Sequence, residues 1–212
     1  MPQHTPEVGA VRRRLRQLRR ELPAGARTRA ERDIARALRH LRVFRPGARI
    51  GVYLAVRGEA DITSSLDTAR SAGATLYAPR ITSRRRSTMV FVPLAPHGGT
   101  VNNVFGIAEP RARAGQRQPV THLDAILVPL VGFDRRGHRL GMGAGFYDRA
   151  LQRRQDASRA WKRPRLIGVA FALQELPAID AAPWDVGLDC IVTEREIIRC
   201  RPDSSAESTD PT

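Results

Sequence analysis

The stretch ARIGVYLAVRGEADITSSLDTARSAGATLYAPR, residues 48–80, predicts the fold class of this chain. It opens with an apolar, partly β-branched run over residues 48–56, which is typical of a buried strand. Residues 61–73 have the pattern of a helix closed by Gly73, and residues 74–80 that of a second strand. A strand, a helix and a strand in this order predict two parallel strands joined by a crossover, which is the unit of a parallel sheet.

The segments on both sides of this unit continue the alternation of helices and strands. Before it we expect two amphipathic helices, residues 7–21 and a second from Thr28 as N-cap to Leu41, separated by Pro23 and Gly25. The apolar stripe of the first helix is Val8, Val11, Leu15, Leu18 and Leu22. After the unit we expect strands at residues 88–94, 123–133, 166–171 and 189–194, a helix at residues 145–154, and loops over residues 95–121.

The run over residues 123–133 is almost unbroken in its apolar character, which indicates a central strand buried on both faces. The prediction is therefore the α/β class, with a three-layer α/β/α single domain over residues 1–200 and a mostly parallel central sheet. Residues 201–212 are poor in apolar side chains, so we expect a disordered tail there. In folds of this kind, ligands bind beyond the carboxyl ends of the strands.

The composition is typical of a soluble enzyme-sized domain. In the 212 residues no apolar run approaches the ~20 residues that a membrane span needs, and the basic N-terminal region has no apolar signal-peptide core. The only two cysteines, Cys190 and Cys200, match no zinc-binding spacing, which fits a reducing compartment. We expect a cytoplasmic protein that acts as a monomer and has no membrane partner.

The net charge of +15 leaves a second class of function open. A strongly basic chain can bind nucleic acid, and such a protein would show steeply salt-dependent binding without turnover. However, the 36 basic residues are all Arg except Lys162 and are scattered along the chain, with the tightest cluster at residues 84–86. This pattern is typical of a GC-rich codon bias, and we expect no specific nucleic-acid partner.

The stretch RLGMGAGFYDR, residues 139–149, is the strongest local sign of chemistry. Three alternating glycines let the main chain approach a ligand closely, and a glycine-rich turn before a helix can bind phosphate. The stretch fits neither the dinucleotide G-x-G-x-x-G pattern, which would need Gly at Phe146, nor a P-loop. A tight strand-to-helix connection remains the structural alternative. Asp148 could complement the start of the helix or hold Mg²⁺ beside a phosphate.

Five stretches, in order and spacing, resemble the 5-formyltetrahydrofolate cyclo-ligase family, also called methenyltetrahydrofolate synthetase. They are RRRLR at residues 12–16, YLAVRGEADI at 53–62, FGIAEP at 105–110, LVPLVGFDRRGHRLGMGAGFYDRAL at 127–151 and PWDVGLDCIVTE at 183–194. The resemblance covers about residues 10–196. It implies the ATP- and Mg²⁺-dependent conversion of 5-formyltetrahydrofolate into 5,10-methenyltetrahydrofolate, with release of ADP and phosphate.

The resemblance also implies a set of binding residues. It places ATP beside Arg12, Arg13, Arg14, Leu15, Arg16, Arg139, Leu140, Gly141, Met142, Gly143, Ala144, Gly145, Phe146 and Tyr147. It places the folate beside Leu54, Glu59, Met142, Gly143, Ala144, Gly145 and Phe146, and the Mg²⁺ cofactor on Asp148 and Asp185. From the residues alone, Arg12 and Arg16 share one helix face and could reach one phosphate, or form a solvated face; Glu59 could equally be a solvated loop acid.

Two positions depart from the pattern of the family. Arg12 stands where Lys is common, which keeps the charge but replaces a point donor by a planar fork. Ala144 stands where Gly or Lys is common, so any contact from a Lys there is missing. A different enzyme with the same glycine loop, such as a relative of the sugar-phosphate isomerases or CoA-transferases, is the catalytic alternative, and it would not depend on ATP.

Overall fold

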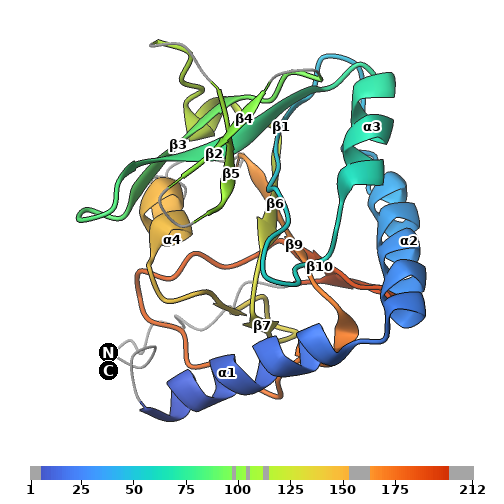
Figure 1. The fold of residues 1–212 in the computed structure, drawn as a ribbon, viewed down its shortest axis with the longest axis vertical. Helices are drawn as coiled ribbons and strands as arrows, with labels where there is room; N and C mark the ends of the chain where they lie inside the picture. Colours follow the sequence, from blue (N-terminus) through green and yellow to red (C-terminus); the bar gives the residue numbers. More distant parts are fainter. Residues whose placement is uncertain (1–5, 97–98, 104–105, 112–114, 153–162, 201–212) are drawn as a thin grey trace, which may run out of the picture.

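A seven-stranded sheet forms the centre of the molecule (Figure 1). The computed structural model describes residues 6–96, 99–103, 106–111, 115–152 and 163–200; the expected tail at 201–212 and the expected helix end at 153–154 lie outside the described residues. The strand order is β11 (Ile197–Arg199), β10 (Cys190–Val192), β9 (Arg165–Val169), β6 (Ala125–Pro129), β1 (Arg49–Gly51), β2 (Thr75–Ser83) and β3 (Thr88–Pro93).

The strand–helix–strand unit that the sequence predicts is confirmed. β1 pairs in parallel with β2, with Ile50 opposite Leu76, and the helix α3 (Thr63–Ser71) connects them. The four pairings from β2 to β10 are parallel, and only the edge strands β3 and β11 run antiparallel to their neighbours. Because the chain builds outward from β1 in one direction and from β6 in the other, the order reverses between these two strands. A parallel α/β sheet offers its ligand site at this reversal.

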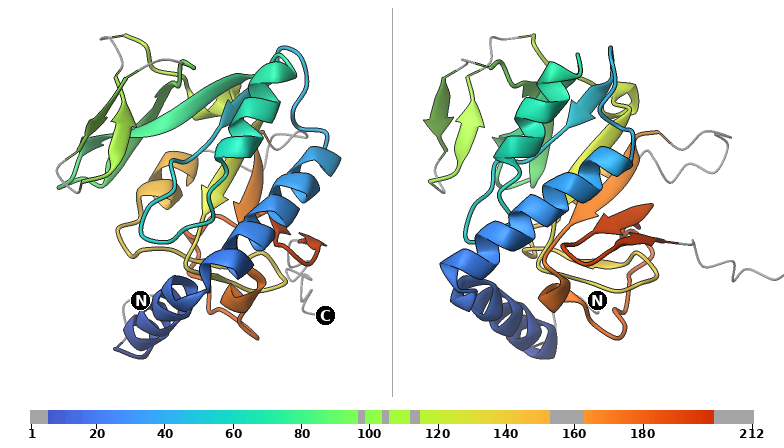
Figure 2. Two further views of the ribbon diagram at one scale, coloured as in Figure 1. Left: turned by 45° about the vertical axis from the view of Figure 1, so that its right-hand side comes forward. Right: turned by 90° about the vertical axis from the view of Figure 1, so that its right-hand side faces the viewer.

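Helices cover both faces of the sheet, as expected for a three-layer fold (Figures 1 and 2). On one face α2 (Ala24–His40) and α3 pack over the strands, and Ile34 and Leu38 of α2 are fully buried beside Ile50 of β1. On the other face lies the short helix α4 (Phe146–Leu151), whose Leu151 is fully buried. The helix α1 (Pro6–Glu21) crosses one end of the sheet. Its residue Arg16 lines the cavity described below. No helix among the described residues is long and apolar enough to cross a membrane.

The apolar stripe predicted for α1 is wrong at one turn. Leu15 is buried as expected, but Leu18 is 38% exposed and Arg19 is buried in its place. The guanidinium of Arg19 donates hydrogen bonds to the carbonyl oxygens of Leu130, directly after β6, and of Arg57, in a turn that follows β1. Those carbonyls need donors, and leucine has none to offer.

Several predicted boundaries also differ. The second helix begins at Ala24, after Pro23, four residues earlier than predicted, and Thr28 lies inside it with its hydroxyl on the carbonyl of Ala24 at 3.0 Å. Proline suits a helix start because the first N–H groups have no partner there. Of the predicted strand at 48–56, mainly residues 49–51, which form β1, are hydrogen-bonded in the sheet. The loops at 95–121 contain a two-stranded sheet of β4 (Thr100–Asn102) and β5 (Ala108–Pro110).

The long apolar run at 123–133 forms two elements instead of one strand. After β6 the chain turns away, and β7 (Gly132–Phe133) pairs with β8 (Arg139–Leu140) in a separate sheet. Gln174, in the short 3-10 turn η4 (Ala172–Gln174), donates its side-chain amide to the carbonyls of Leu130 and Val131 at 2.8 and 2.9 Å. This buried amide takes the place of the sheet partner and lets the strand end inside the core.

Candidate functional site

A cavity of about 780 Å³ opens at the carboxyl ends of β1 and β6, where the strand order reverses. Its floor includes Tyr53 and Leu54 after β1, and Pro129 and Leu130 at the end of β6. The residues that line it and that the sequence also assigned to a ligand are Arg16, Leu54, Glu59, Arg139, Gly141, Met142, Gly143, Ala144, Gly145, Phe146, Tyr147, Asp148 and Asp185. The structure therefore brings the predicted folate and metal residues to one place with most of the predicted ATP residues, whereas Arg12, Arg13, Arg14, Leu15 and Leu140 do not line this cavity.

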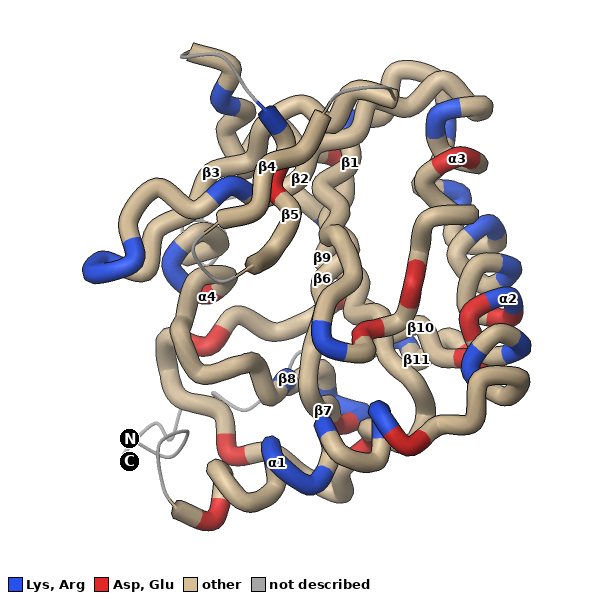
Figure 3. The backbone as a smooth tube through the Cα atoms, in the orientation of Figure 1, with Lys and Arg blue, Asp and Glu red and all other residues tan. Residues whose placement is uncertain are grey.

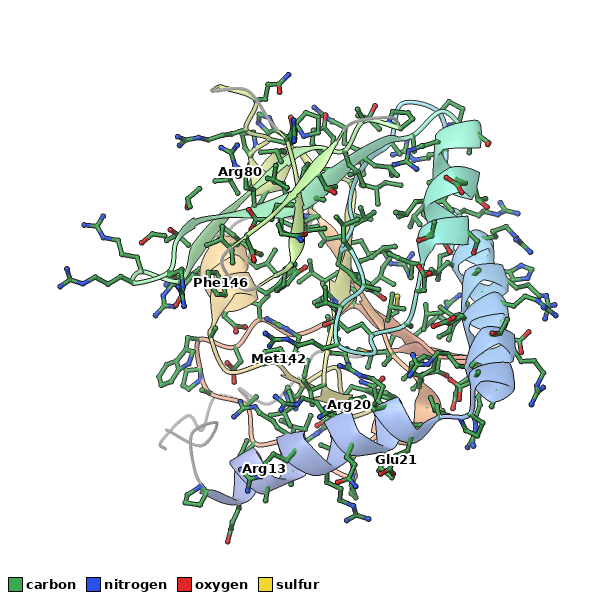
Figure 4. All side chains as sticks on the ribbon, in the orientation of Figure 1. Arg13, Arg20, Glu21, Arg80, Met142 and Phe146 are labelled. Carbon is green, nitrogen blue, oxygen red and sulfur yellow. The ribbon has the colours of Figure 1, made fainter. Side chains whose placement is uncertain are left out.

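The glycine loop lies between β8 and α4 and forms one wall of this cavity. Figure 4 shows Met142 and Phe146 between α1 and the β2–β3 hairpin. Gly143 and Gly145 have φ angles of +94° and +68°, which side-chain-bearing residues rarely adopt. A Cβ added at Gly141 would meet nothing within 4 Å. Gly143 and Gly145 are thus required by their backbone conformation, and Gly141 leaves open space where a side chain would stand.

The N-terminal arginines are divided between the cavity and solvent. Arg16 lines the cavity, and Arg12 donates from Nε to the carbonyl of Gly141 at 2.9 Å. Burial lowers the pKa of Arg12, and the nearby charge of Asp185 acts in the opposite direction. Arg13 and Arg14 are exposed and do not line the cavity. Leu15 and Leu140 are buried together in a small apolar cluster, so their side chains stabilise the glycine loop by packing.

Asp148 and Asp185, 37 positions apart, reach the cavity from α4 and from the loop before β10. Asp148 Oδ1 pairs with the guanidinium of the buried Arg139 and accepts the N–H of Val186 at 3.4 Å. Asp185 Oδ2 accepts the N–H of Ala182 at 2.7 Å. The described residues contain no cluster of three or more His, Cys, Asp or Glu side chains that could hold a metal by itself. Two carboxylates beside a phosphate site are the donor set that Mg²⁺ commonly uses with a nucleotide.

Glu59 lines the cavity from the turn that follows β1. Its Oε2 accepts the N–H of Val56 at 3.1 Å, and the side chain is half-buried. Burial raises the pKa of Glu59, while the hydrogen bond from Val56 and the cations Arg19 and Arg57 lower it, with burial the larger effect. The carboxylate is therefore a cavity group, and its reading as an ordinary solvated loop acid is disfavoured.

The structure adds lining residues that had no assigned role in the sequence analysis. Glu109 is 8% exposed, and its Oε1 accepts the N–H of Ile81 at 3.0 Å and the amide of Asn103 at 2.8 Å. These bonds fasten the β4–β5 sheet to β2, and residues of this small sheet line the cavity. The stretch FGIAEP, which contains Glu109, was the available signal. The aromatic ring of Trp184, 56% exposed, also lines the cavity.

Asp134, in the stretch at residues 127–151, has a structural role. It is fully buried, and its carboxylate accepts the main-chain N–H groups of Arg136, His138 and Ile179, each at 3.0 Å. The ring of His138 lies 3.0 Å from the same carboxylate and does not line the cavity. Asp134 thus fixes the β7–β8 turn, from which the glycine loop departs.

The charges of the cavity are balanced locally. Its lining contains the cations Arg16, Arg57, Arg139 and Arg149 and the acids Glu59, Glu109, Asp148 and Asp185. Elsewhere the basic residues are spread over α1, α2 and the tip of the β2–β3 hairpin, on different sides of the molecule (Figure 3). The cavity is therefore arranged to hold a ligand with both charged and neutral polar groups.

Comparisons with known proteins agree with this arrangement. The model of the 5-formyltetrahydrofolate cyclo-ligase family matches residues 4–194. The 5-formyltetrahydrofolate cyclo-ligase of Haemophilus influenzae is 30% identical over 178 residues, which cover 84% of this chain and 92% of that protein. The enzyme of the same name from Mycolicibacterium smegmatis is 31% identical, covering 90% and 96%. The solved structure of the 5,10-methenyltetrahydrofolate synthetase of Aquifex aeolicus has a TM-score of 0.76 at 27% identity and covers 95% of this chain and 96% of that one.

Proposed function

Because the chain belongs to the 5-formyltetrahydrofolate cyclo-ligase family, we propose that it converts 5-formyltetrahydrofolate into 5,10-methenyltetrahydrofolate with ATP as co-substrate. The observation that carries this proposal is the cavity at the strand-order reversal. It brings the glycine loop, the carboxylates of Asp148 and Asp185, and the carboxylate of Glu59 to one site of sufficient volume, about 780 Å³.

The reaction has two bond-making steps. In the first, the oxygen of the N5-formyl group attacks the terminal phosphorus of ATP, and the bond to the ADP oxygen breaks. In the second, N10 attacks the formyl carbon, loses its proton to solvent or a cavity base, and the phosphate leaves with the former formyl oxygen. Phosphoryl transfer requires mainly positioning and charge neutralisation from a protein, and the glycine loop, Arg16 and Arg139 are the groups here that supply them.

The donor set of the cavity fits Mg²⁺. Asp148 and Asp185 would hold the ion together with phosphate oxygens of the nucleotide. When bound, the ion neutralises negative charge on the phosphates. Arg139 keeps Asp148 in place through their ion pair, and the N–H of Ala182 fixes one oxygen of Asp185. Both carboxylates are thereby oriented before the nucleotide arrives.

Glu59 and Leu54 would contact the folate. A half-buried carboxylate can accept two N–H groups from a pterin, whose amino and ring N–H donors lie side by side. The apolar lining from Pro79, Ile81 and Met89 offers a surface for the flat ring. In this proposal the pterin lies beside β1 and β2, and the glycine loop over residues 142–146 contacts both the folate and the nucleotide.

A change at Glu59 tests the folate end. Glu59→Gln should raise the KM for 5-formyltetrahydrofolate about 10- to 100-fold, since hydrogen bonds to a charged acceptor contribute ~1.5–3 kcal/mol. The KM for ATP should change little. Glu175→Gln is the matched control, because Glu175 pairs with Arg135 away from the cavity. An equal rise in both KM values would assign Glu59 a structural role.

The raised pKa of Glu59 adds a pH dependence with a defined sign. Binding requires the ionised carboxylate, so affinity for the folate is present above the pKa of Glu59 and is lost as pH falls through it. Because burial raises this pKa above its ordinary value, the loss begins at a higher pH than for an exposed glutamate. The acid limb of a plot of 1/KM for the folate against pH should be absent in Glu59→Gln.

The remaining proposals concern the setting of the enzyme. We infer a cytoplasmic monomer whose domain spans residues 1–200, without a specific nucleic-acid partner.

The direct test of the function is the rise in ultraviolet absorbance of the methenyl product when the purified protein is mixed with 5-formyltetrahydrofolate and Mg-ATP. No product with ATP present would contradict the proposal. Product formation that did not need ATP would favour the isomerase- or transferase-like alternative.

A further inference from the structure

Glu59 lies at the end of a turn with an uncommon backbone. Its N–H donates to the carbonyl of Val56 at 3.0 Å, which closes a four-residue turn. The two central residues, Arg57 and Gly58, have φ angles of 52° and 79°. Positive φ at both positions is the mark of a type I′ turn, in which Gly, Asn or Asp is favoured. Arginine is strained at the first of them, and strained backbone persists only where surrounding contacts hold it.

Two arginines from two different helices hold this turn. Arg19 of α1 donates from Nη2 to the carbonyl of Arg57 at 2.9 Å, and from Nη1 to the carbonyl of Leu130 at 3.3 Å. Arg27 of α2 donates from Nη1 to the carbonyl of Gly58 at 3.2 Å and from Nη2 to the carbonyl of Arg19. Both central carbonyls of the turn are therefore bound, and Arg19 also ties the turn to the end of β6.

Burying the charged guanidinium of Arg19 costs free energy unless the charge interacts with other groups. The residue is 1% exposed, and the described residues place no carboxylate within salt-bridge distance of it. Burial lowers the pKa of Arg19, and among the acids it is Glu59 whose charge raises it. The charged groups that act on Glu59 are Arg19 from α1 and Arg57 of its own turn, and the charge of Glu59 in turn raises the pKa of the buried phenols Tyr53 and Tyr147. Arg19 and Arg57 are thus the two cations on this carboxylate.

We propose that Arg19 is a positioning residue for the folate: it holds the turn at residues 56–59 so that Glu59 faces the cavity, and it supplies one of the two cations near that carboxylate. Arg19 does not line the cavity and acts only through Glu59. The inference rests on the proposed function, in which Glu59 accepts N–H groups of the substrate. It also explains why α1 buries a guanidinium where its apolar stripe calls for leucine.

The test compares Arg19→Met and Arg19→Lys with the parent enzyme, and uses Arg36→Met as the matched control. Arg36 is an exposed arginine of α2 that pairs with Asp33 on its own helix and does not line the cavity. In Arg19→Met the KM for 5-formyltetrahydrofolate should rise about tenfold, the effect of losing charged hydrogen bonds, with the KM for ATP near the parent value. The acid limb of folate binding should move to higher pH, because a cation that lowers the pKa of Glu59 is gone.

Arg19→Lys and a second-site change separate geometry from charge. Lysine keeps the cation but cannot donate to two carbonyls as the planar fork does. We expect a raised folate KM with the acid limb near its parent position. Adding Arg57→Gly to Arg19→Met removes the backbone strain of the turn, so the folate KM should recover in part, while the acid limb should move further to higher pH because the second cation on Glu59 is also lost.

The outcomes decide between the proposal and a purely structural role. An unchanged folate KM, or equal rises in both KM values without a shift of the acid limb, overturns the proposal. If Arg19→Met does not fold, Arg19→Lys alone decides by the ratio of the two KM values. The parent enzyme in the same assay isolates the proposed function: failure of the parent to form product rejects that function, whereas an active parent with an unaffected variant rejects only the role of Arg19.

Discussion

Replacing Asp148 by Asn should reduce turnover at least about a hundredfold, comparable to the loss of a principal charge-stabilising group from an active site. The neutral amide is a weaker ligand for Mg²⁺, so the phosphates lose part of their charge neutralisation. The fold should remain, because the side-chain oxygen of Asn can still accept from Arg139 and from the N–H of Val186. The measurement is kcat at limiting and at saturating Mg²⁺, with circular dichroism to verify folding.

The control for this change is Asp67→Asn. Asp67 pairs with Arg70 on the exposed face of α3 and has a side-chain exposure of 70%. The same loss of charge there should leave turnover and its dependence on Mg²⁺ unchanged. Partial recovery of Asp148→Asn by excess Mg²⁺ would support a role in metal binding. Near-parent turnover at limiting Mg²⁺ in a folded Asp148→Asn protein would remove this residue from the metal site.

Gly143→Val should weaken the binding of Mg-ATP more than tenfold. The φ angle of +94° at this position is one that a β-branched residue adopts only at a cost of roughly 1–3 kcal/mol. The added side chain would also point toward the guanidinium of Arg12, whose Cζ lies 3.7 Å from the position of the new Cβ. The loop would therefore shift, and its N–H groups would no longer meet the phosphates.

Gly47→Val separates this effect from a general loss of stability. Gly47 has a φ angle of +73° and no atom within 4 Å of an added Cβ, in a turn before β1 and outside the cavity. It should lower the thermal midpoint through the same strain and leave nucleotide binding intact. Calorimetric titration of Mg-ATP into both folded variants provides the comparison. Parent-like affinity in Gly143→Val would show that the loop does not bind phosphate through its backbone.

The sheet and the glycine loop were predictable because both depend on contiguous sequence. Apolar runs alternating with amphipathic segments favour a parallel sheet whatever their exact partners, and the β1–α3–β2 unit follows from one stretch of 33 positions, residues 48–80. The boundaries were less predictable. The run at 123–133 splits because Gln174, more than 40 positions away, takes the carbonyls of Leu130 and Val131. No local pattern contains that information.

By itself, the sequence determined the α/β class, the family and the residues of the glycine loop, since these follow from local periodicity and from short ordered motifs. Only the tertiary structure decided which neighbouring side chains face the site. Arg12 and Arg16 reach the loop or the cavity, Arg13 and Arg14 face solvent, and Arg19 is buried beneath Glu59. The physical reason is that a helix face has meaning only relative to the surface on which it packs. Here that surface includes the main-chain carbonyls of Leu130 and Arg57, which accept hydrogen bonds from a guanidinium and which leucine would leave without a donor.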